Sequence, residues 1–218
     1  MILAIDTATR WTGLALHDGT AVLAEHGWRS TNTQTIELAP AIENMLARAA
    51  VPAEFLKGIA VAIGPGSYTG LRIGLGLAKG MALAHQTPLI GVPTLDIMAA
   101  ALPQMPGALV IIAEAGRRRI TAGIYGWQTV KGWQAPELPL NTTWEELLEK
   151  LEPPAVLTGE ISIGAMKQIR AAGKGLRAVR AVDRVRRAGY LAEVGWHRLR
   201  KGKVDNAAAL TPIYLREP

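Results

Sequence analysis

The sequence predicts an α/β protein that contains two related lobes, and two observations support this prediction. Short apolar segments alternate with amphipathic ones along the 218 residues, as expected when strands and helices share a core. The order of strand hairpin and then helix occurs once before residue 103 and again after it, without sequence identity between the two copies. We therefore expect a first lobe over residues 1–102 and a second over 103–187. Residues 188–218 should form a final helix and a tail that pack back on the first lobe.

Each element of the first lobe follows from its local pattern. Apolar runs predict strands, Asp18-Gly19 is a tight-hairpin signal, and a Gly-Pro-Gly turn at 64–66 separates a buried strand from the next helix. A helix at about 33–50 has an apolar face of Ile36, Ala39, Ile42, Met45, Leu46 and Ala49. In chain order, the expected elements are strands at 2–6, 13–17 and 20–26, the helix at 33–50, a strand at 58–63, a helix at 67–86, a strand at 88–92 and a helix at 94–102.

The second lobe repeats this order after a break that contains Pro and Gly at 103–107. Thr142 opens a helix, because Glu145 stands three residues after it at the capping-box spacing. Pro153-Pro154 ends that helix, and Gly173 ends the one after it. The expected elements are strands at 108–113, 120–126 and 129–135, the helix from Thr142, a strand at 155–158, a helix at 162–172, a strand at 176–182, a helix at 188–201 and an extended tail at 210–215.

The helix at 67–86 is unusual because it is apolar nearly all round. Residues on two adjacent sides are apolar or lack a side chain: Gly70, Leu71, Ile73, Gly74, Leu75, Leu77, Ala78, Met81, Ala82 and Ala84. Gly74, Gly76 and Gly80 lie in the helix interior, where each costs about 1 kcal/mol relative to Ala unless a close contact compensates. Either the helix is buried inside one large core, or one side packs on the chain's own sheet and the other on a partner.

Composition excludes several classes of function. The chain has no Cys, which excludes thiol catalysis, disulfides and thiolate metal sites, and its four histidines are too scattered for a metal-binding pair. It has no run of about 18 apolar residues and no signal-peptide pattern, so we expect a soluble, cytoplasmic protein with no membrane partner. The net charge of +6 is uneven. Arg117, Arg118 and Arg119 suit contact with a nucleic acid, but the sequence alone favours the alternative of an ordinary arginine-rich surface.

Two polar turns are candidates for binding a nucleotide or another anion. The first places Asp6, Thr7 and Thr9 at the end of a strand, where a carboxylate beside hydroxyls can hold a metal-bound phosphate. The second offers backbone amides at a helix N-terminus, from Gly64, Gly66 and Ser67. The alternative in both cases is a tight turn whose polar groups bond only to the chain's own backbone.

Several motifs are similar to those of the bacterial TsaB (YeaZ) family. They are Leu3-Ala-Ile-Asp-Thr-Ala-Thr9, Gly64-Pro-Gly-Ser-Tyr-Thr-Gly-Leu-Arg-Ile-Gly74, Gly91-Val-Pro-Thr-Leu95 and Pro212-Ile-Tyr-Leu-Arg216. The long glycine-rich motif is specific, and the match is spread over the first 100 residues and the last few. The resemblance implies an actin-like (ASKHA) fold of two RNase H-like lobes, each a mixed β-sheet with helices.

The resemblance also implies a non-catalytic scaffold or activator. Members of the family pair with the catalytic paralogue TsaD, and with the ATPase TsaE, to place threonylcarbamoyl on adenosine beside the anticodon of tRNAs that read ANN codons. ATP is used by the complex, no cofactor is bound by this chain alone, and the chain alone would form a homodimer. The implied interface lies on the helices at 33–50 and 67–86 and comprises Ile36, Ile42, Met45, Gly70, Ile73, Gly74, Leu77, Ala78 and Met81.

The chain departs from the family at two places. Asn32 stands where the family often has a His, and the helix histidines with which TsaD holds its metal are missing. The family's Asp-Ala-Arg motif is Glu114-Ala-Gly-Arg117 here. Glu114 and Glu160 each stand beside one glycine, and their charge argues against a triphosphate in the second lobe. We therefore expect no metal and no catalytic residue. The alternative is an independent enzyme of actin-like fold, either an ATP phosphotransferase or a peptidase.

Overall fold

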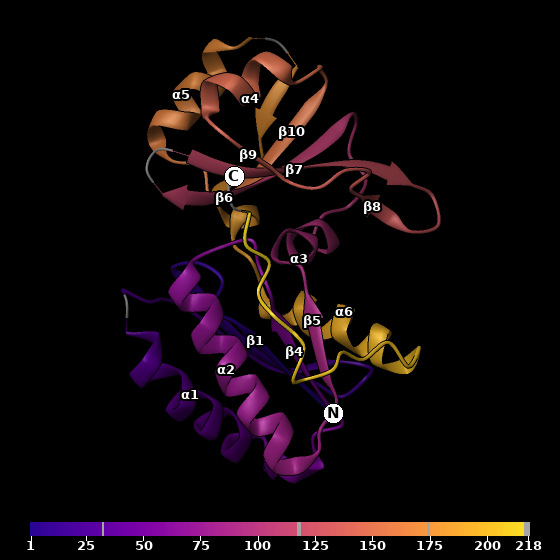
Figure 1. Cartoon of the computed structure of the whole chain (residues 1–218). Helices are drawn as coiled ribbons and strands as arrows, with labels where there is room; N and C mark the ends of the chain where they lie inside the picture. Colours follow the sequence, from indigo (N-terminus) through magenta and orange to yellow (C-terminus); the bar gives the residue numbers. More distant parts are fainter. Residues whose placement is uncertain (32, 117–118, 174, 216–218) are drawn as a thin grey trace. The chain divides into compact units, whose positions relative to one another are not determined.

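The computed structural model describes residues 1–31, 33–116, 119–173 and 175–215, and these form two compact units (Figure 1). The first unit comprises Met1–Ile97 and Arg187–Tyr214. The second comprises Met98–Arg186 and the C-terminal residues from Leu215. The boundaries expected from the sequence lie at 102/103 and 187/188.

The first unit contains one sheet of five strands in the order β3-β2-β1-β4-β5. The strands are β1 (Ile2–Asp6), β2 (Trp11–His17), β3 (Val22–Arg29), β4 (Gly58–Ala62) and β5 (Leu89–Val92). The first three form an antiparallel meander, whereas β4 and β5 run parallel to β1. All residues of β1, β4 and β5 are buried, which explains why these strands are continuous apolar runs.

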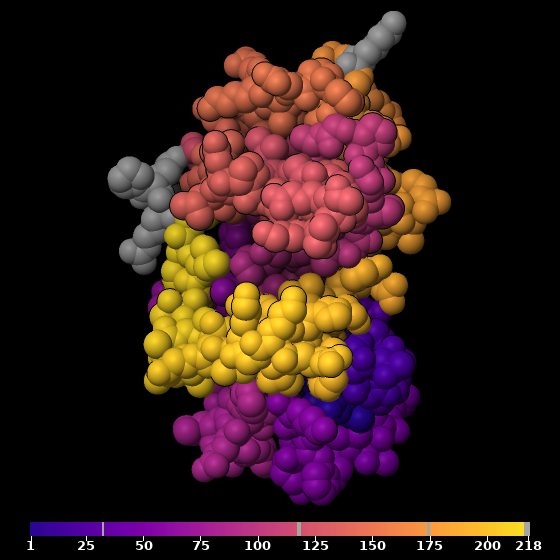
Figure 2. Space-filling view, turned by 90° about the vertical axis from the view of Figure 1, so that its right-hand side faces the viewer, coloured from indigo at the N-terminus to yellow at the C-terminus, as the bar shows by residue number. Residues whose placement is uncertain are grey.

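Helices cover both faces of this sheet (Figure 1). Alternate residues of β1 point to opposite faces, so Leu3 packs with α1 (Gln34–Arg48) and α2 (Tyr68–His85), whereas Ile2 packs with α6 (Ala188–Arg200). Helix α6 lies very close to β4, because a Cβ added at Gly195 would be 2.5 Å from the Cβ of Ala60. Figure 2 shows α6 and the following tail as an outer layer of this unit. The remaining elements are η1 (Ala53–Phe55) and α3 (Thr94–Ala100).

The second unit repeats the topology of the first. Its strands are β6 (Ala108–Gly116), β7 (Arg119–Gln128), β8 (Gly132–Gln134), β9 (Leu140–Thr142), β10 (Ala155–Gly159) and β11 (Leu176–Ala178). Their order is β11-β10-β6-β7-β8, and β9 also pairs with β7. As in the first unit, the first strand pairs antiparallel with the second and parallel with a later one. Helices α4 (Trp144–Lys150) and α5 (Ile163–Ala171) pack on the sheet, and η2 (Ala181–Arg184) follows β11. Both units therefore have the expected RNase H-like strand order.

Several boundaries differ from the sequence prediction in the second unit. The capping box is formed by Thr143 and Glu146, one residue later than predicted, because Thr142 belongs to β9 and pairs with Ile120. The strand predicted at 129–135 is only β8, and β9 was not predicted. The strand predicted at 176–182 ends at Ala178, after which η2 forms and Arg180 pairs with Asp183.

The apolar face predicted for α1 is partly wrong. The side chain of Ile36 is 73% exposed and Ala39 is also exposed, whereas Leu38 is buried. The helix begins at Gln34 and turns its buried face toward the sheet from Gln34, Leu38, Ile42, Met45 and Leu46. Among the described residues, no helix combines the length and apolar character that crossing a membrane requires.

Candidate functional site

The two polar turns predicted from the sequence lie against each other in the first unit. The backbone N–H of Ser67 donates to the carbonyl oxygen of Ala8 at 2.6 Å, and the hydroxyl of Thr7 donates to the carbonyl oxygen of Gly70 at 2.6 Å. A Cβ at Gly66 would lie 2.1 Å from the carbonyl oxygen of Ala8, and one at Gly70 would lie 2.2 Å from that of Thr7. The glycine-rich turn therefore allows the two backbones to touch.

The polar groups of these turns bond largely to the chain itself. Asp6 is 1% exposed, and its Oδ1 accepts a hydrogen bond from the N–H of Ala8 at 3.0 Å. The hydroxyl of Thr9 accepts one from the backbone two residues later. The N–H of Gly64 donates to the hydroxyl of Thr94 at 3.0 Å, and Ser67 caps α2 by accepting from the N–H of its third residue. These hydrogen bonds occupy polar groups that would otherwise be available to a phosphate. They agree with the alternative of a tight turn whose polar groups bond to the chain itself. Anion binding here stays a prediction.

The inner face of α2 belongs to the chain's own core. Gly70, Gly74 and Ala78 are buried, and a Cβ at Gly74 would lie 2.2 Å from the hydroxyl oxygen of Thr7. Contact with Thr7, which directly follows β1, therefore explains the glycines at positions 70 and 74. Ile42 and Met45 of α1 are buried in the same core. We therefore remove these five residues from the predicted partner surface, because a buried group contributes no surface to a partner.

The outer face of α2 carries the other two glycines. Apart from the neighbouring backbone of the helix itself, no described atom lies within 4 Å of a Cβ built at Gly76 or Gly80, so no packing contact among the described residues requires a glycine at either position. We define the outer stripe of α2 as the apolar and small residues on this side: Ile73, Gly76, Leu77, Gly80, Met81, Leu83 and Ala84. Leu83 is 82% exposed, whereas Ile73, Leu77 and Met81 lie at the margin of the stripe, half-buried and packed against the chain's own core. Helix α1, with exposed Ile36, packs beside α2 (Figure 1).

An aromatic cluster at the start of α2 was not predicted as a site. The ring centroids of Tyr68 and Tyr214 lie 5.0 Å apart, and the guanidinium carbon of Arg72 lies 4.3 Å from the ring centroid of Tyr68. The Nε of Arg72 also donates to the hydroxyl of Tyr214 at 3.3 Å. All three residues belong to the motifs that carry the family resemblance, which was the available signal. Half-exposed Tyr and Arg side chains of this kind are enriched among the residues that dominate binding energy at interfaces.

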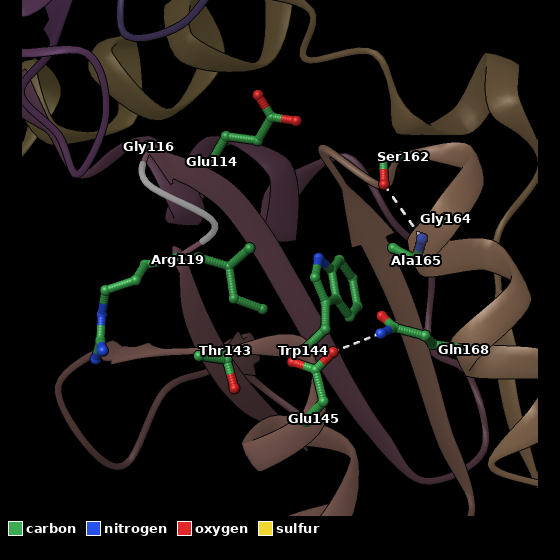
Figure 3. Close-up of a pocket in the computed structure, with 11 residues that line it drawn as sticks. Glu114, Gly116, Arg119, Thr143, Trp144, Glu145, Ser162, Gly164, Ala165 and Gln168 are labelled. Atoms are coloured by element: carbon green, nitrogen blue, oxygen red, sulfur yellow. Dashed lines mark hydrogen bonds between the residues drawn. The ribbon is translucent and has the colours of Figure 1, made fainter.

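Only one of the three arginines predicted to contact tRNA can be placed, since Arg117 and Arg118 lie outside the described residues. Arg119 donates from Nε to the side-chain oxygen of Asn141 at 3.1 Å and from Nη2 to its carbonyl oxygen at 2.8 Å. It lines a pocket of about 740 Å³ in the second unit (Figure 3). The lining residues are Glu114, Gly116, Arg119, Ile120, Thr143, Trp144, Glu145, Ser162, Gly164, Ala165 and Gln168.

The charges of this pocket do not suit a phosphate group. Figure 3 shows the guanidinium of Arg119 turned away from Trp144, while Glu145 lies beside Gln168. The carboxylate of Glu145 accepts from its own N–H and from the amide of Gln168, and these bonds lower the pKa of that carboxyl below its ordinary value. The carboxylate of Glu160 accepts from the N–H of Glu114 at 2.7 Å. The carboxylates of Glu114 and Glu145, which line this pocket, repel a phosphate group.

Histidines do not form a metal centre within the described residues, where no group of three His, Asp or Glu side chains has suitable geometry for a metal ion. Two of the four are nevertheless close in space. His17 and His197 contact the two carboxylate oxygens of Glu193 from their Nε2 atoms, at 2.8 and 2.9 Å. The Nδ1 of His17 accepts from the N–H of Gly19, so its Nε2 is the donor to Glu193.

Comparisons with known proteins place these features in a family context. Residues 32–132 match the family described as TsaD, tRNA N6-adenosine threonylcarbamoyltransferase. The chain is 32% identical over 162 residues to the tRNA threonylcarbamoyladenosine biosynthesis protein TsaB of Bacillus subtilis (strain 168). That alignment covers 72% of this chain and 70% of the relative.

Solved structures extend the similarity to the whole fold. One, described as an uncharacterized protein with similarity to peptidase YEAZ from Pseudomonas aeruginosa, has a TM-score of 0.81 and 22% identity, with 99% of each chain covered. A ROK hexokinase from Thermus thermophilus has a TM-score of 0.50 and 13% identity, with 92% of this chain and 99% of that chain covered. At these identities the likeness concerns the fold alone, which is the two-lobed actin-like fold.

Proposed function

Because this chain belongs to the TsaB (YeaZ) family of tRNA threonylcarbamoyladenosine biosynthesis proteins, we propose that it is a non-catalytic scaffold subunit that pairs with a TsaD paralogue through the outer stripe of α2. In this role it supports the transfer of threonylcarbamoyl to tRNA, with TsaE as a further partner, and it does not contact the reacting atoms. ATP is used by the complex, and tRNA is reached through the complex.

The observation that carries this proposal is the open position of Gly76 and Gly80. Glycine in an exposed helix interior costs about 1 kcal/mol relative to Ala. No described atom of the chain approaches either residue closely enough to need a missing side chain. The two are four residues apart and therefore lie one above the other on the same face of the helix. A second helix could pack against this flat strip with its backbone close to that of α2.

The match to the TsaD family model supports a related chain as the partner. It spans residues 32–132 and so includes both α1 and α2. Two related chains can associate through equivalent helices in a pseudo-symmetric arrangement, which is the commonest geometry for pairs of similar subunits. The same surface would then serve the homodimer when the catalytic paralogue is absent.

The alternative is an independent enzyme, either an ATP phosphotransferase or a peptidase. A phosphotransferase needs amides and cations that face a triphosphate. In the turn after β1, the side chains of Asp6 and Thr7 form hydrogen bonds with the chain's own backbone instead. The pocket of the second unit is lined by carboxylates. Turnover of ATP or of a peptide that follows the purified chain through two different columns, and is lost in Asp6→Asn, would favour the enzyme instead.

The proposal is tested by adding bulk to the outer stripe. Gly76→Leu and Gly80→Leu should each weaken the dissociation constant for purified TsaD about 5- to 150-fold, since overpacking costs about 1–3 kcal/mol. Gly126→Leu is the matched control, because Gly126 is exposed in the second unit and no described atom lies within 4 Å of its added Cβ. Calorimetric titration measures the affinity, and circular dichroism verifies the fold. Unchanged affinity in both stripe variants contradicts the proposed interface.

A further inference from the structure

The outer edge of β3 is open. β3 is the end strand of its sheet, and no other strand among the described residues pairs with that edge. It pairs with β2 in regular register from Ala24 to Arg29, and a β-bulge at Leu23 separates this part from Val22. In an antiparallel pair, every second residue of such an edge directs its N–H and C=O groups away from the sheet. The strand therefore presents about three residues whose backbone groups are free to pair with another strand.

This edge is held rigidly from both faces. On one face, the indole N–H of Trp28 donates to the carboxylate of Glu37 on α1 at 2.9 Å. On the other, Glu25 accepts from the N–H of Gly189 at 2.8 Å and from the guanidinium of Arg187, whose pKa it raises. A strand fixed in this way loses little further freedom when it binds a partner, which favours association.

A groove runs between this strand and α1. It has a volume of about 380 Å³ and is lined by Leu23, Ala24, Glu25, His26, Ala41, Asn44, Met45, Arg48 and Ala49. Four consecutive strand residues form one wall and one side of the helix forms the other. The half-buried and buried apolar members are Ala24, Ala41, Met45 and Ala49, which leave room for one side chain of moderate size. A strand edge beside a helix with an apolar groove is a geometry that proteins use to bind extended peptides.

The charge of the groove selects among possible occupants. Arg48 is exposed on the helix wall, and its Nε donates to the side-chain oxygen of Asn44 at 3.0 Å. The one carboxylate in the lining, that of Glu25, is already paired with Arg187. The free charge is therefore positive, which attracts an acidic segment. A second copy would bring a second Arg48 and no free carboxylate to this groove, so the charge disfavours self-pairing.

We propose that the groove between β3 and α1 binds an extended acidic segment of a partner protein, which adds a strand to the open edge of the sheet. Its backbone pairs with β3 between Ala24 and Arg29. Alternate side chains of the segment point into the groove, where an apolar one contacts Ala41 and Ala49 and an acidic one pairs with Arg48. This surface is separate from the outer stripe of α2 and does not depend on the scaffold role.

The test uses the full chain and a phage library of random octapeptides as the probe. Selected peptides should alternate apolar and acidic residues, and the strongest one, made synthetically, should bind with a dissociation constant in the micromolar range. Arg48→Glu and Asn44→Trp, both at exposed positions of the groove, should weaken this binding at least tenfold. Arg170→Glu, at an exposed position of α5, is the charge-matched control and should bind as the unchanged protein does. The backbone amides of an extended peptide form two alternating sets, one on each edge. N-methylation of the set that faces β3 should abolish binding, whereas N-methylation of the other set should not.

Four results would overturn the proposal. The first is a selection that enriches no peptide above the level found with Asn44→Trp. The second is a selected peptide that binds Arg48→Glu as tightly as the unchanged protein, or that still binds when either of the two alternating sets of its amides is N-methylated. The third is saturable binding of a single-stranded oligouridylate that Arg48→Glu removes, since the groove would then serve RNA. A dimer in sedimentation that Arg48→Glu strengthens would mean that a second copy occupies the edge, which also contradicts an acidic partner.

Discussion

The hydroxyl of Thr7 donates a hydrogen bond to the carbonyl oxygen of Gly70 at 2.6 Å, and this bond joins the end of β1 to the first turn of α2. Both residues are buried, and one turn further along the helix Gly74 leaves the space that the Thr7 side chain fills. Glycine on the inner face of α2 therefore serves the chain's own packing, whereas glycine on the outer face has no such role.

This contrast predicts opposite effects of the same substitution at two positions of one helix. Gly74→Ala should destabilise the first unit by about 1–3 kcal/mol, because the new methyl group would meet the hydroxyl of Thr7. Gly76→Ala should stabilise it by up to about 1 kcal/mol, because helix propensity rises and no described atom lies nearby. Urea unfolding followed by circular dichroism measures both. Equal effects of the two changes would mean that the faces of α2 are not distinguished by packing.

Thr7 itself should be sensitive to loss of its hydroxyl. Thr7→Val keeps the shape of the side chain but leaves the carbonyl of Gly70 without this donor in a buried place, which should cost about 1–3 kcal/mol. Thr7→Ser retains the hydroxyl and is the control, with a smaller loss from the missing methyl group. If valine proves as stable as threonine in urea titration, the hydrogen bond contributes nothing to the fold.

The capping box of α4 predicts a pH dependence. The hydroxyl of Thr142 and the N–H of Thr143 donate to the carboxylate of Glu146, and these bonds lower the pKa of that carboxyl from its ordinary value of 4.5. Because the folded pKa is the lower one, the stabilisation is fully present above about pH 5 and is lost as the pH falls through the folded pKa. Glu146→Gln should therefore flatten the dependence of melting temperature on pH between about 5 and 3.

Glu149→Gln removes an exposed carboxyl from the same helix and is the matched control for this measurement. It should leave the slope close to that of the unchanged protein. A slope that falls equally in both variants would show that general charge, and not the cap, determines the acid response.

Local signals in the sequence were sufficient for most elements, and the failures have physical causes. The helix that begins after Ser67 was predicted correctly because the Gly-Pro-Gly turn and the capping serine mark the boundary within a few residues. The start of α4 was missed by one residue because two consecutive threonines can each cap a helix, and strand pairing by Thr142 decides between them.

The surface of α2 could not be assigned from periodicity alone. A helix that is apolar all round gives no indication of which side meets the chain's own sheet, and Gly74 and Ala78 were therefore predicted to lie at the partner interface. The contact between Thr7 and Gly74 joins residues 67 positions apart, which no local pattern encodes. The position of β3 at the edge of the sheet could likewise not be predicted, because strand order depends on the whole sheet and not on local sequence.

The last prediction concerns the tRNA modification in cells. A strain depleted of its own protein is supplied with each variant, and threonylcarbamoyladenosine is measured by mass spectrometry of nucleosides from total tRNA. The double variant Gly76→Leu with Gly80→Leu should abolish the modification, because bulk on the outer stripe blocks pairing with the catalytic paralogue. Asp6→Asn should retain it, because the amide oxygen can still accept from the N–H of Ala8 while the charge that could hold a metal-bound phosphate is gone. Immunoblotting must show equal amounts of each variant. Loss of modification with Asp6→Asn but not with the stripe variant would instead assign a nucleotide-driven activity to this chain, and the enzyme alternative would replace the scaffold.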